Sequence, residues 1–259
     1  MDPNYNMKRN KSIFLQNKVF SRWILNKING FTNYKSADSN TDLSNGVLLV
    51  QLAIYLTQIN KKINYELEPK NKLEKIKNCN LALNILKNDG VSLHSITEED
   101  IINNEKARLN LIWKLILHYS IKQSIVHSDL LEWASKIIKK YPIIKDFSPY
   151  WLSICALLDF YYPSKINFNS LHQNNEKENA ELATKVMKEL EIPIFIYPDE
   201  SFQYKIDDKS FLTQLSAARN VLEKKSKSED DKKENNSIKS EVVKQKERSI
   251  FLVQSECVS

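Results

Sequence analysis

The feature that most constrains the fold is an order of helical patterns that occurs twice along the chain. Apolar residues recur mainly at the spacing of one helix face, and strand alternation bounded by tight turns is nearly absent. Trp23 and Trp133 head equivalent amphipathic stretches roughly 110 residues apart, and both are expected in a core. In a chain of 259 residues this internal period predicts two similar helical domains and an all-α fold.

The first set of patterns contains four expected helices. An apolar stripe over residues 20–28 predicts an opening helix, and the nearly all-round apolar run 47–56 predicts a central, buried one. Two further helices, over residues 76–87 and 109–121, are expected to pack around it. Gly90 follows the third helix as a glycine C-cap would, and should terminate it.

The second set repeats this order. Residues 130–138 predict an opening helix and residues 151–161 an apolar central helix. An amphipathic stretch over 180–190 ends at Ile192-Pro193, and residues 211–222 predict the closing helix. The second half of the chain is therefore expected to fold like the first.

The composition of the chain suggests where the domains begin and end. Beyond Lys225 the sequence is rich in Ser, Lys, Glu, Asp and Asn, which predicts a disordered tail. The short apolar run Ile250–Val253 near its end is either a docking segment or without function. The expected division is a basic N-terminal arm (1–14), a first domain (15–122), a short linker (123–128), a second domain (129–225) and a charged tail (226–259).

Charge distinguishes the two expected domains. Residues 15–122 carry 15 basic and 10 acidic side chains, whereas residues 128–225 carry 13 and 14. The first domain is thus the basic half, which suits an acidic partner reached by salt-dependent attraction. Nucleic acid is not the expected partner, because the lysines between 70 and 77 are interrupted by Glu74 and no DNA- or RNA-binding motif occurs.

Several classes of function lack their usual sequence signals. The four histidines are scattered, and no Ser, Cys or carboxylate pair stands in a catalytic context, so no enzymatic activity is expected. Three widely separated glycines, three cysteines without ligand-like spacing and the lack of an EF-hand loop indicate no cofactor and no metal. No apolar stretch is long enough to cross a bilayer and no secretory signal is evident, so a cytoplasmic protein is expected.

Several motifs of the two halves resemble the tandem calponin-homology actin-binding domain of filamins, α-actinins, spectrins and dystrophin. The resemblance covers about residues 15–225. Its most specific segment is LIWKLILHYSI at 111–121, which is similar to the filamin version of the family's last helix. The other matching segments are residues 16–23, 42–49, 78–86, 90–93 with Ile96, 130–133, 147–148 with Trp151, 155–157 and 190–193.

The resemblance implies binding of F-actin on the actin cytoskeleton, mainly through the first repeat. Residues at the family's filament-facing positions are Gln16, Lys18, Ser21 and Arg22; then Arg108, Leu109, Trp113 and Leu117; then Lys136, Lys139 and Lys140 in the second repeat. Basic side chains would attract an acidic filament, and an aromatic or aliphatic anchor would supply most of the energy after docking. Burial statistics alone do not decide whether Trp113 lies in the core or contacts a filament, and the resemblance favours the filament contact.

Departures from the family pattern keep other functions open. Asn45 replaces the usual Asp before Gly46, and the second repeat lacks the Asp-Gly turn, with the segment before Cys155 about three residues short. The alternative is a signalling or adhesion scaffold that binds protein helices or acidic phosphoinositide lipid, with microtubule binding as a third reading. The short linker predicts limited hinge opening. The sequence leaves open whether the chain oligomerises or cross-links filaments.

Overall fold

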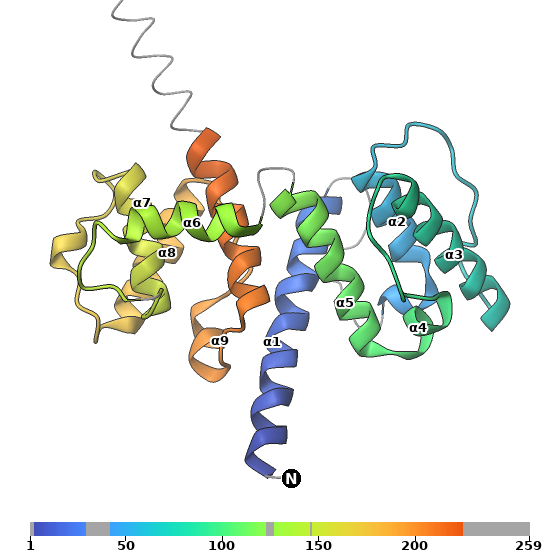
Figure 1. Ribbon diagram of the computed structural model, residues 1–259, viewed down its shortest axis with the longest axis horizontal. Coiled ribbons are helices and arrows are strands. Elements are labelled where there is room, and N and C mark those ends of the chain that lie inside the picture. Colours follow the sequence, from blue (N-terminus) through green and yellow to red (C-terminus); the bar gives the residue numbers. More distant parts are fainter. Residues whose placement is uncertain (1–2, 30–41, 123–126, 146, 225–259) are drawn as a thin grey trace, which may run out of the picture. The chain divides into compact units, whose positions relative to one another are not determined.

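The structure, a computed structural model, describes residues 3–29, 42–122, 127–145 and 147–224 (Figure 1). The chain divides into two compact units, residues 1–218 and 219–259. Helices dominate the described ranges and no β-strand forms there, which confirms the all-α prediction. None of these helices combines the length and the apolar character that a membrane span needs.

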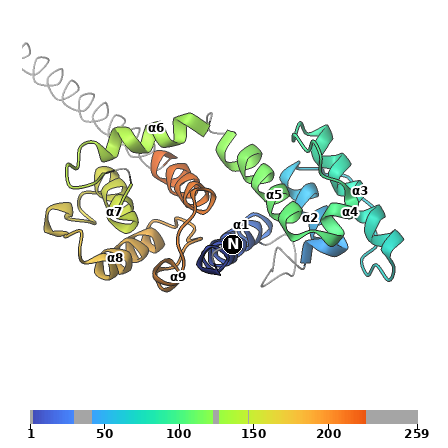
Figure 2. The ribbon, with the colours of Figure 1, turned by 60° about the horizontal axis from the view of Figure 1, so that its bottom comes forward.

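The first helical set occupies residues 3–122. Its elements are α1 (Pro3–Ile28), the 3-10 helix η1 (Asp42–Asn45), α2 (Val47–Leu56), α3 (Lys72–Asn88), α4 (Glu98–Asn103), α5 (Glu105–Ile116) and the π-helical turn η2 (Leu117–Lys122). The expected central helix is confirmed as α2, whose residues Leu48, Leu49 and Leu52 are fully buried. Both α1 and α3 contact α2, and Figures 1 and 2 show α3 beside it.

The second set repeats this arrangement. Its elements are α6 (His127–Ile138), α7 (Tyr150–Tyr161), the 3-10 helix η3 (Phe168–Ser170), α8 (Glu176–Glu189), α9 (Pro198–Gln203) and a helix over residues 208–224. The central helix is α7, buried from Trp151 to Leu158 and packed against α8. The two expected helical sets are therefore present, in the expected order.

The start of α2 requires a glycine. Gly46 lies in the left-handed region at φ +81°, and a Cβ at this position would lie 2.6 Å from the Cβ of Asn78. The close approach joins α2 to α3, where the buried Asn78 side chain bonds both the N–H and the carbonyl of Glu66. In the second repeat Phe147 has a positive φ of 60° and is followed by a cis Ser148–Pro149 bond, with Pro149 at the N-cap of α7. This turn replaces the Asp-Gly turn that the sequence lacks.

Both α3 and α8 end in the same hydrogen-bonded turn. After α3, Gly90 has φ +86° and Val91 N–H donates to the carbonyl of Leu86 at 3.0 Å, which confirms the predicted glycine cap. After α8, Glu191 has φ +59° and Ile192 N–H donates to the carbonyl of Met187 at 2.8 Å. The second repeat therefore forms the turn with a residue that pays a conformational cost in the left-handed region.

The two equivalent tryptophans differ in burial. Trp23 is buried, as predicted, and its Nε1 donates to Ser120 Oγ at 2.9 Å. Trp133 is only half-buried, with its Nε1 donating to the hydroxyl of Tyr161 at 3.0 Å, so it lies at the edge of the core. The second repeat instead buries Trp151 from its central helix.

Cys79 and Cys155 are buried and unpaired, and burial raises the pKa of each thiol to about 12. The linker residues 123–126 and the expected tail 226–259, with Cys257 and the run 250–253, lie outside the described residues. Because α1 begins at Pro3, residues 3–14 of the expected basic arm are helical and continuous with the first repeat.

Candidate functional site

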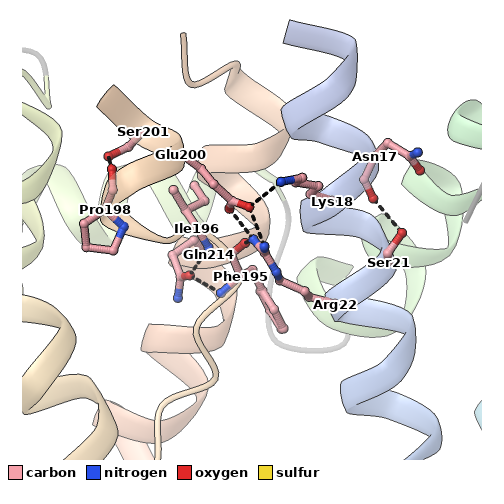
Figure 3. Close-up of polar contacts among 10 residues, drawn as sticks. All are labelled: Asn17, Lys18, Ser21, Arg22, Phe195, Ile196, Pro198, Glu200, Ser201 and Gln214. Carbon is pink, nitrogen blue, oxygen red and sulfur yellow. Dashed lines mark hydrogen bonds and ion pairs between the residues drawn. The ribbon is translucent and has the colours of Figure 1, made fainter. Parts of the chain in front are cut away.

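Helix α1 places two cations on the side opposite its buried stripe. Val19, Phe20 and Trp23 are buried, whereas Lys18 and Arg22 lie one helical turn apart and remain partly exposed. Figure 3 shows both cations pointing from α1 toward Glu200 of α9. The shared face predicted for Lys18 and Arg22 is therefore present, and it is turned toward the second repeat.

Glu200 joins both cations. Its Oε1 lies 2.9 Å from Lys18 Nζ and 2.6 Å from Arg22 Nη2, while its Oε2 contacts Arg22 Nη1. Burial opposes ionisation of this carboxyl, but the hydrogen bonds and charges of Arg22 and Lys18 outweigh burial, so its pKa lies below the ordinary value. Glu200 is therefore held as a carboxylate by the two cations that it binds.

Arg22 makes two further contacts with the second repeat. Its Nη1 donates to the carbonyl of Phe195 at 2.7 Å, and its guanidinium carbon lies 4.5 Å from the centre of the Tyr197 ring. Lys18 lies over the Phe14 ring at 4.8 Å. Both terminal nitrogens of the Arg22 guanidinium are thus hydrogen-bonded, and its planar face packs on an aromatic ring.

The position of Glu200 is fixed by α9. Pro198 starts this short helix, and Ser201 Oγ donates to the Pro198 carbonyl at 2.7 Å. The same hydroxyl accepts a hydrogen bond from the indole of buried Trp151 at 2.8 Å. These bonds tie the acidic helix to the central helix of the second repeat.

A second contact involves Gln16 and Asp207. The Gln16 side-chain amide donates to Asp207 Oδ1 at 3.0 Å, and the same oxygen accepts from the backbone N–H groups of Lys209 and Ser210. Asp207 therefore caps the helix over 208–224 and contacts α1 at the same time.

Trp113 lies between the repeats. Its ring is parallel to that of Phe20, with the centroids 6.3 Å apart, and Lys209 Nζ lies 5.8 Å from its centre. A cavity of about 790 Å³ beside the indole is lined otherwise by the second repeat, including Tyr150 and Phe211. Trp113 is half-buried, so neither the core nor the fully exposed interpretation describes it.

The other candidate residues of the first repeat are more enclosed. Ser21 is buried and its hydroxyl donates to the carbonyl of Asn17, and Arg108 is buried with its Nη1 donating to the carbonyl of Ile101 at 2.8 Å. Leu109 is buried and Leu117 half-buried. The structure thus brings Lys18 and Arg22 together at Glu200, and it places Gln16 against Asp207. Trp113 packs on Phe20 of the same helix, whereas Ser21, Arg108 and Leu109 are buried.

Of the three candidate lysines of the second repeat, Lys136 lies in the last turn of α6 and the other two directly follow this helix, far from Glu200 in the sequence. Lys136 pairs with Glu132 on the preceding turn at 2.7 Å, and both side chains are largely exposed. Lys139 is exposed, and Lys140 Nζ lies 4.1 Å from the centre of the exposed Phe160 ring. These lysines form a separate basic surface.

Each half of the chain matches one family model. Residues 15–121 and 125–224 each match the calponin homology (CH) domain. The chain belongs to the calponin homology family. Together the two matches cover most of the residues, so both helical sets are CH repeats.

Several known proteins are similar to this pair of CH repeats. Alpha-actinin-like protein 1 of Schizosaccharomyces pombe is 29% identical over 224 residues, which cover 81% of this chain and 36% of the relative. Interaptin of Dictyostelium discoideum is 32% identical over 227 residues, covering 79% of this chain and 13% of the relative. The chain therefore spans about a third or less of the length of these two relatives.

A solved structure confirms the fold independently. The actin-crosslinking core of Schizosaccharomyces pombe fimbrin superposes with a TM-score of 0.59 at 21% identity. The match covers 82% of this chain and 48% of the fimbrin chain. At this identity the likeness supports the tandem CH fold alone.

Sequence reasoning did not single out Glu200, Asp207 or Gln214, the residues of the second repeat that contact or support α1. Glu200 is one of 32 acidic residues and stands in a helix of six residues, too short for a periodic signal. Its partners, Lys18 and Arg22, lie more than 170 positions away, and local sequence patterns do not report a pair so distant in the chain.

Proposed function

We propose that this chain binds actin filaments through the surface that α1 and α5 form on the first CH repeat. The observation that carries the proposal is that α1 of a CH repeat presents two partly exposed cations, Lys18 and Arg22, while half-buried Trp113 of α5 packs against the same helix at Phe20. Two cations provide attraction to an acidic filament, and a half-buried indole provides an apolar anchor. Membership of the CH family and the likeness to an alpha-actinin-like protein support this choice. The proposal places the protein on the actin cytoskeleton.

The second repeat contacts the same two cations that the proposed filament site uses. Glu200 binds Lys18 and Arg22, so a filament and the second repeat compete for them. In this proposal the first repeat supplies the contacts and the second regulates access to them. Filament binding then requires that the Glu200 contact be released first.

Co-sedimentation with actin filaments at low salt tests the proposal. The chain is expected to pellet with filaments, and the double variant Lys18→Glu, Trp113→Ala to pellet much less while keeping its helical circular dichroism. The control is Lys185→Glu, which makes the same charge change at an exposed position of α8. A wild-type chain that stays in the supernatant at every filament concentration contradicts the proposal.

One surface favours a second function, binding of acidic phosphoinositide lipid. Exposed Ile143 and Phe160 lie near the basic end of α6, where Lys139 and Lys140 are also exposed. Apolar side chains flanked by cations suit the boundary of an anionic membrane. The test is sedimentation with vesicles that contain phosphatidylinositol bisphosphate, in which Lys139→Glu, Lys140→Glu should abolish pelleting. Sedimentation with microtubules, run in parallel, tests the remaining alternative, which is microtubule binding.

A further inference from the structure

The segment that Arg22 contacts is irregular backbone held by one side chain. Residues 192–196 connect α8 to α9 without forming a helix or strand. Gln214, fully enclosed in the helix over 208–224, accepts hydrogen bonds at Oε1 from the N–H groups of Phe195 (2.7 Å) and Ile196 (3.2 Å). Its Nε2 donates to the carbonyl of Pro193 at 2.9 Å. One side chain thus satisfies three backbone groups that the irregular segment leaves without regular partners.

The same segment presents its other side to α1. The carbonyl of Phe195 accepts from Arg22, while the N–H of Phe195 donates to Gln214 (Figure 3). The chain then continues into Tyr197, whose ring lies beside the guanidinium, and into α9 with Glu200. Every contact that Arg22 makes with the second repeat is therefore within six residues of the backbone that Gln214 holds.

We propose that Gln214 is a positioning residue that holds this segment in the conformation that Arg22 recognises. A guanidinium has its donors in a fixed plane, so its acceptors must be held at fixed places for all of them to bind at once. Three hydrogen bonds from a buried amide hold the segment before Arg22 arrives, which lowers the entropy lost on closure. Gln214 thereby sets how tightly the second repeat closes on the first. The effect of Gln214 on filament affinity rests on the proposed function, whereas its effect on the contact between the two repeats does not.

Asn179 provides a matched control. It is also a buried amide of the second repeat, and its Nδ2 donates to the carbonyl of His172 at 2.9 Å, in the connection between α7 and α8. Asn179→Leu and Gln214→Met each remove one buried amide that holds a loop. Of the two amides, only Gln214 holds the segment that Arg22 contacts. A general loss of stability should therefore appear in both variants, whereas a loss of positioning should appear only in Gln214→Met.

Spin labels on the whole chain measure closure directly. Labels are attached at Asn26→Cys on α1 and Asp199→Cys on α9, both exposed positions, in a Cys257→Ser background. Cys79 and Cys155 are buried and stay unlabelled. Wild type and Asn179→Leu are expected to give a narrow distance distribution, and Gln214→Met a broad one. Faster amide exchange at Phe195 and Ile196 with the narrow distribution retained would overturn the proposal, because the segment would then be loosened without effect on closure.

Two further measurements complete the test. Gln214→Asn keeps a buried amide but is one methylene too short to reach the segment, so it is expected to give the broad distribution as Gln214→Met does, and it serves if Gln214→Met does not fold. In co-sedimentation, Gln214→Met is expected to raise filament affinity about fivefold, the lower end of typical coupling between sites, with Asn179→Leu unchanged. Failure of the wild type to bind filaments refutes the proposed function alone, because the distance measurement needs no filament.

Discussion

At the scale of single residues, Arg22 is the side chain on which the contact between the repeats depends. Its guanidinium binds both oxygens of Glu200 and the carbonyl of Phe195, and its face lies on Tyr197. A lysine at this position has no planar fork and would bind one of these acceptors at a time. The identity of the cation therefore matters here, whereas Lys18 acts mainly as a point charge.

Neutralising Glu200 should increase filament affinity. Glu200→Gln removes the charge that holds Lys18 and Arg22, and charge-assisted hydrogen bonds of this kind contribute on the order of 1.5 kcal/mol or more, which corresponds to about a tenfold gain. Co-sedimentation at fixed salt measures the effect. Glu189→Gln breaks the exposed pair with Lys165 in the same repeat and should leave affinity unchanged. Weaker binding by Glu200→Gln would mean that the carboxylate does not compete with the filament.

Acid should loosen the contact. The pKa of Glu200 lies below its ordinary value of 4.5, so the native state binds this proton less readily than the unfolded chain does. The stabilisation is therefore fully present above pH 4.5 and is lost as the pH falls through the lower native pKa. Comparing unfolding of wild type and Glu200→Gln across this range measures it. A difference between the two proteins that persists unchanged at the acid end would contradict the assignment.

Sequence reasoning predicted part of the site at this scale. Lys18 and Arg22 were expected on one face because they are four residues apart, and they are. Their partner Glu200 was not predictable, since helix periodicity reports local neighbours and not contacts across the chain. Matching family positions identified Arg108 and Leu109 but carried no information about their burial. A role for the candidate residues in filament binding stays a prediction.

At the scale of elements, the ends of α3 and α8 show one turn formed with two kinds of residue. Gly90 and Glu191 occupy the same left-handed position and are followed by the same hydrogen bond. Glycine adopts this conformation without steric cost, and a residue with a Cβ does not. At this turn the second repeat therefore carries local strain that the first repeat lacks.

Replacing Glu191 should relieve that strain. Glu191→Gly is expected to stabilise the protein by about 1 kcal/mol, because glycine removes the Cβ penalty of the left-handed position. The control Glu181→Gly places the same substitution at an exposed position inside α8, where it should destabilise by about 1 kcal/mol. Thermal unfolding followed by circular dichroism measures both, and two shifts in the same direction would refute the explanation.

Long helices were predictable and short ones were not. The central helices α2 and α7 and the end of α3 followed from apolar periodicity and from Gly90. Helix α9, at six residues, is too short to show a period. The family resemblance matched Phe147-Ser148, but the backbone conformation of that turn was not predictable because the Asp-Gly signal is missing there. The early start of α1 was also not expected, because residues 3–14 are mostly polar and basic.

At the scale of the whole molecule, the two repeats contact through side chains that the proposed filament site also uses. The sequence indicated unequal repeats, a basic one that binds and a neutral one that supports or tunes it. The contact of Glu200 with α1 provides a physical route for that tuning. That the second repeat regulates binding stays a prediction.

Zero-length cross-linking should detect the closed arrangement. A carbodiimide joins amines to carboxylates in direct contact, so Lys18 and Glu200, 2.9 Å apart, are expected to couple in the free protein. Addition of filaments should reduce this product as the contact opens. Lys165 and Glu189, 2.7 Å apart within the second repeat, should couple equally in both states and serve as the internal control. Peptide mass spectrometry measures both products, and an undiminished Lys18–Glu200 product on filaments would contradict competition.

The engagement of Arg22 on both edges and its face also has a kinetic consequence. If the guanidinium must leave Glu200 before it meets a filament, each encounter waits for a spontaneous opening of the molecule. The observed association rate should then rise with filament concentration only at first, and level off at the opening rate. The protein would attach to filaments at a pace set by its own structure, however many filaments surround it.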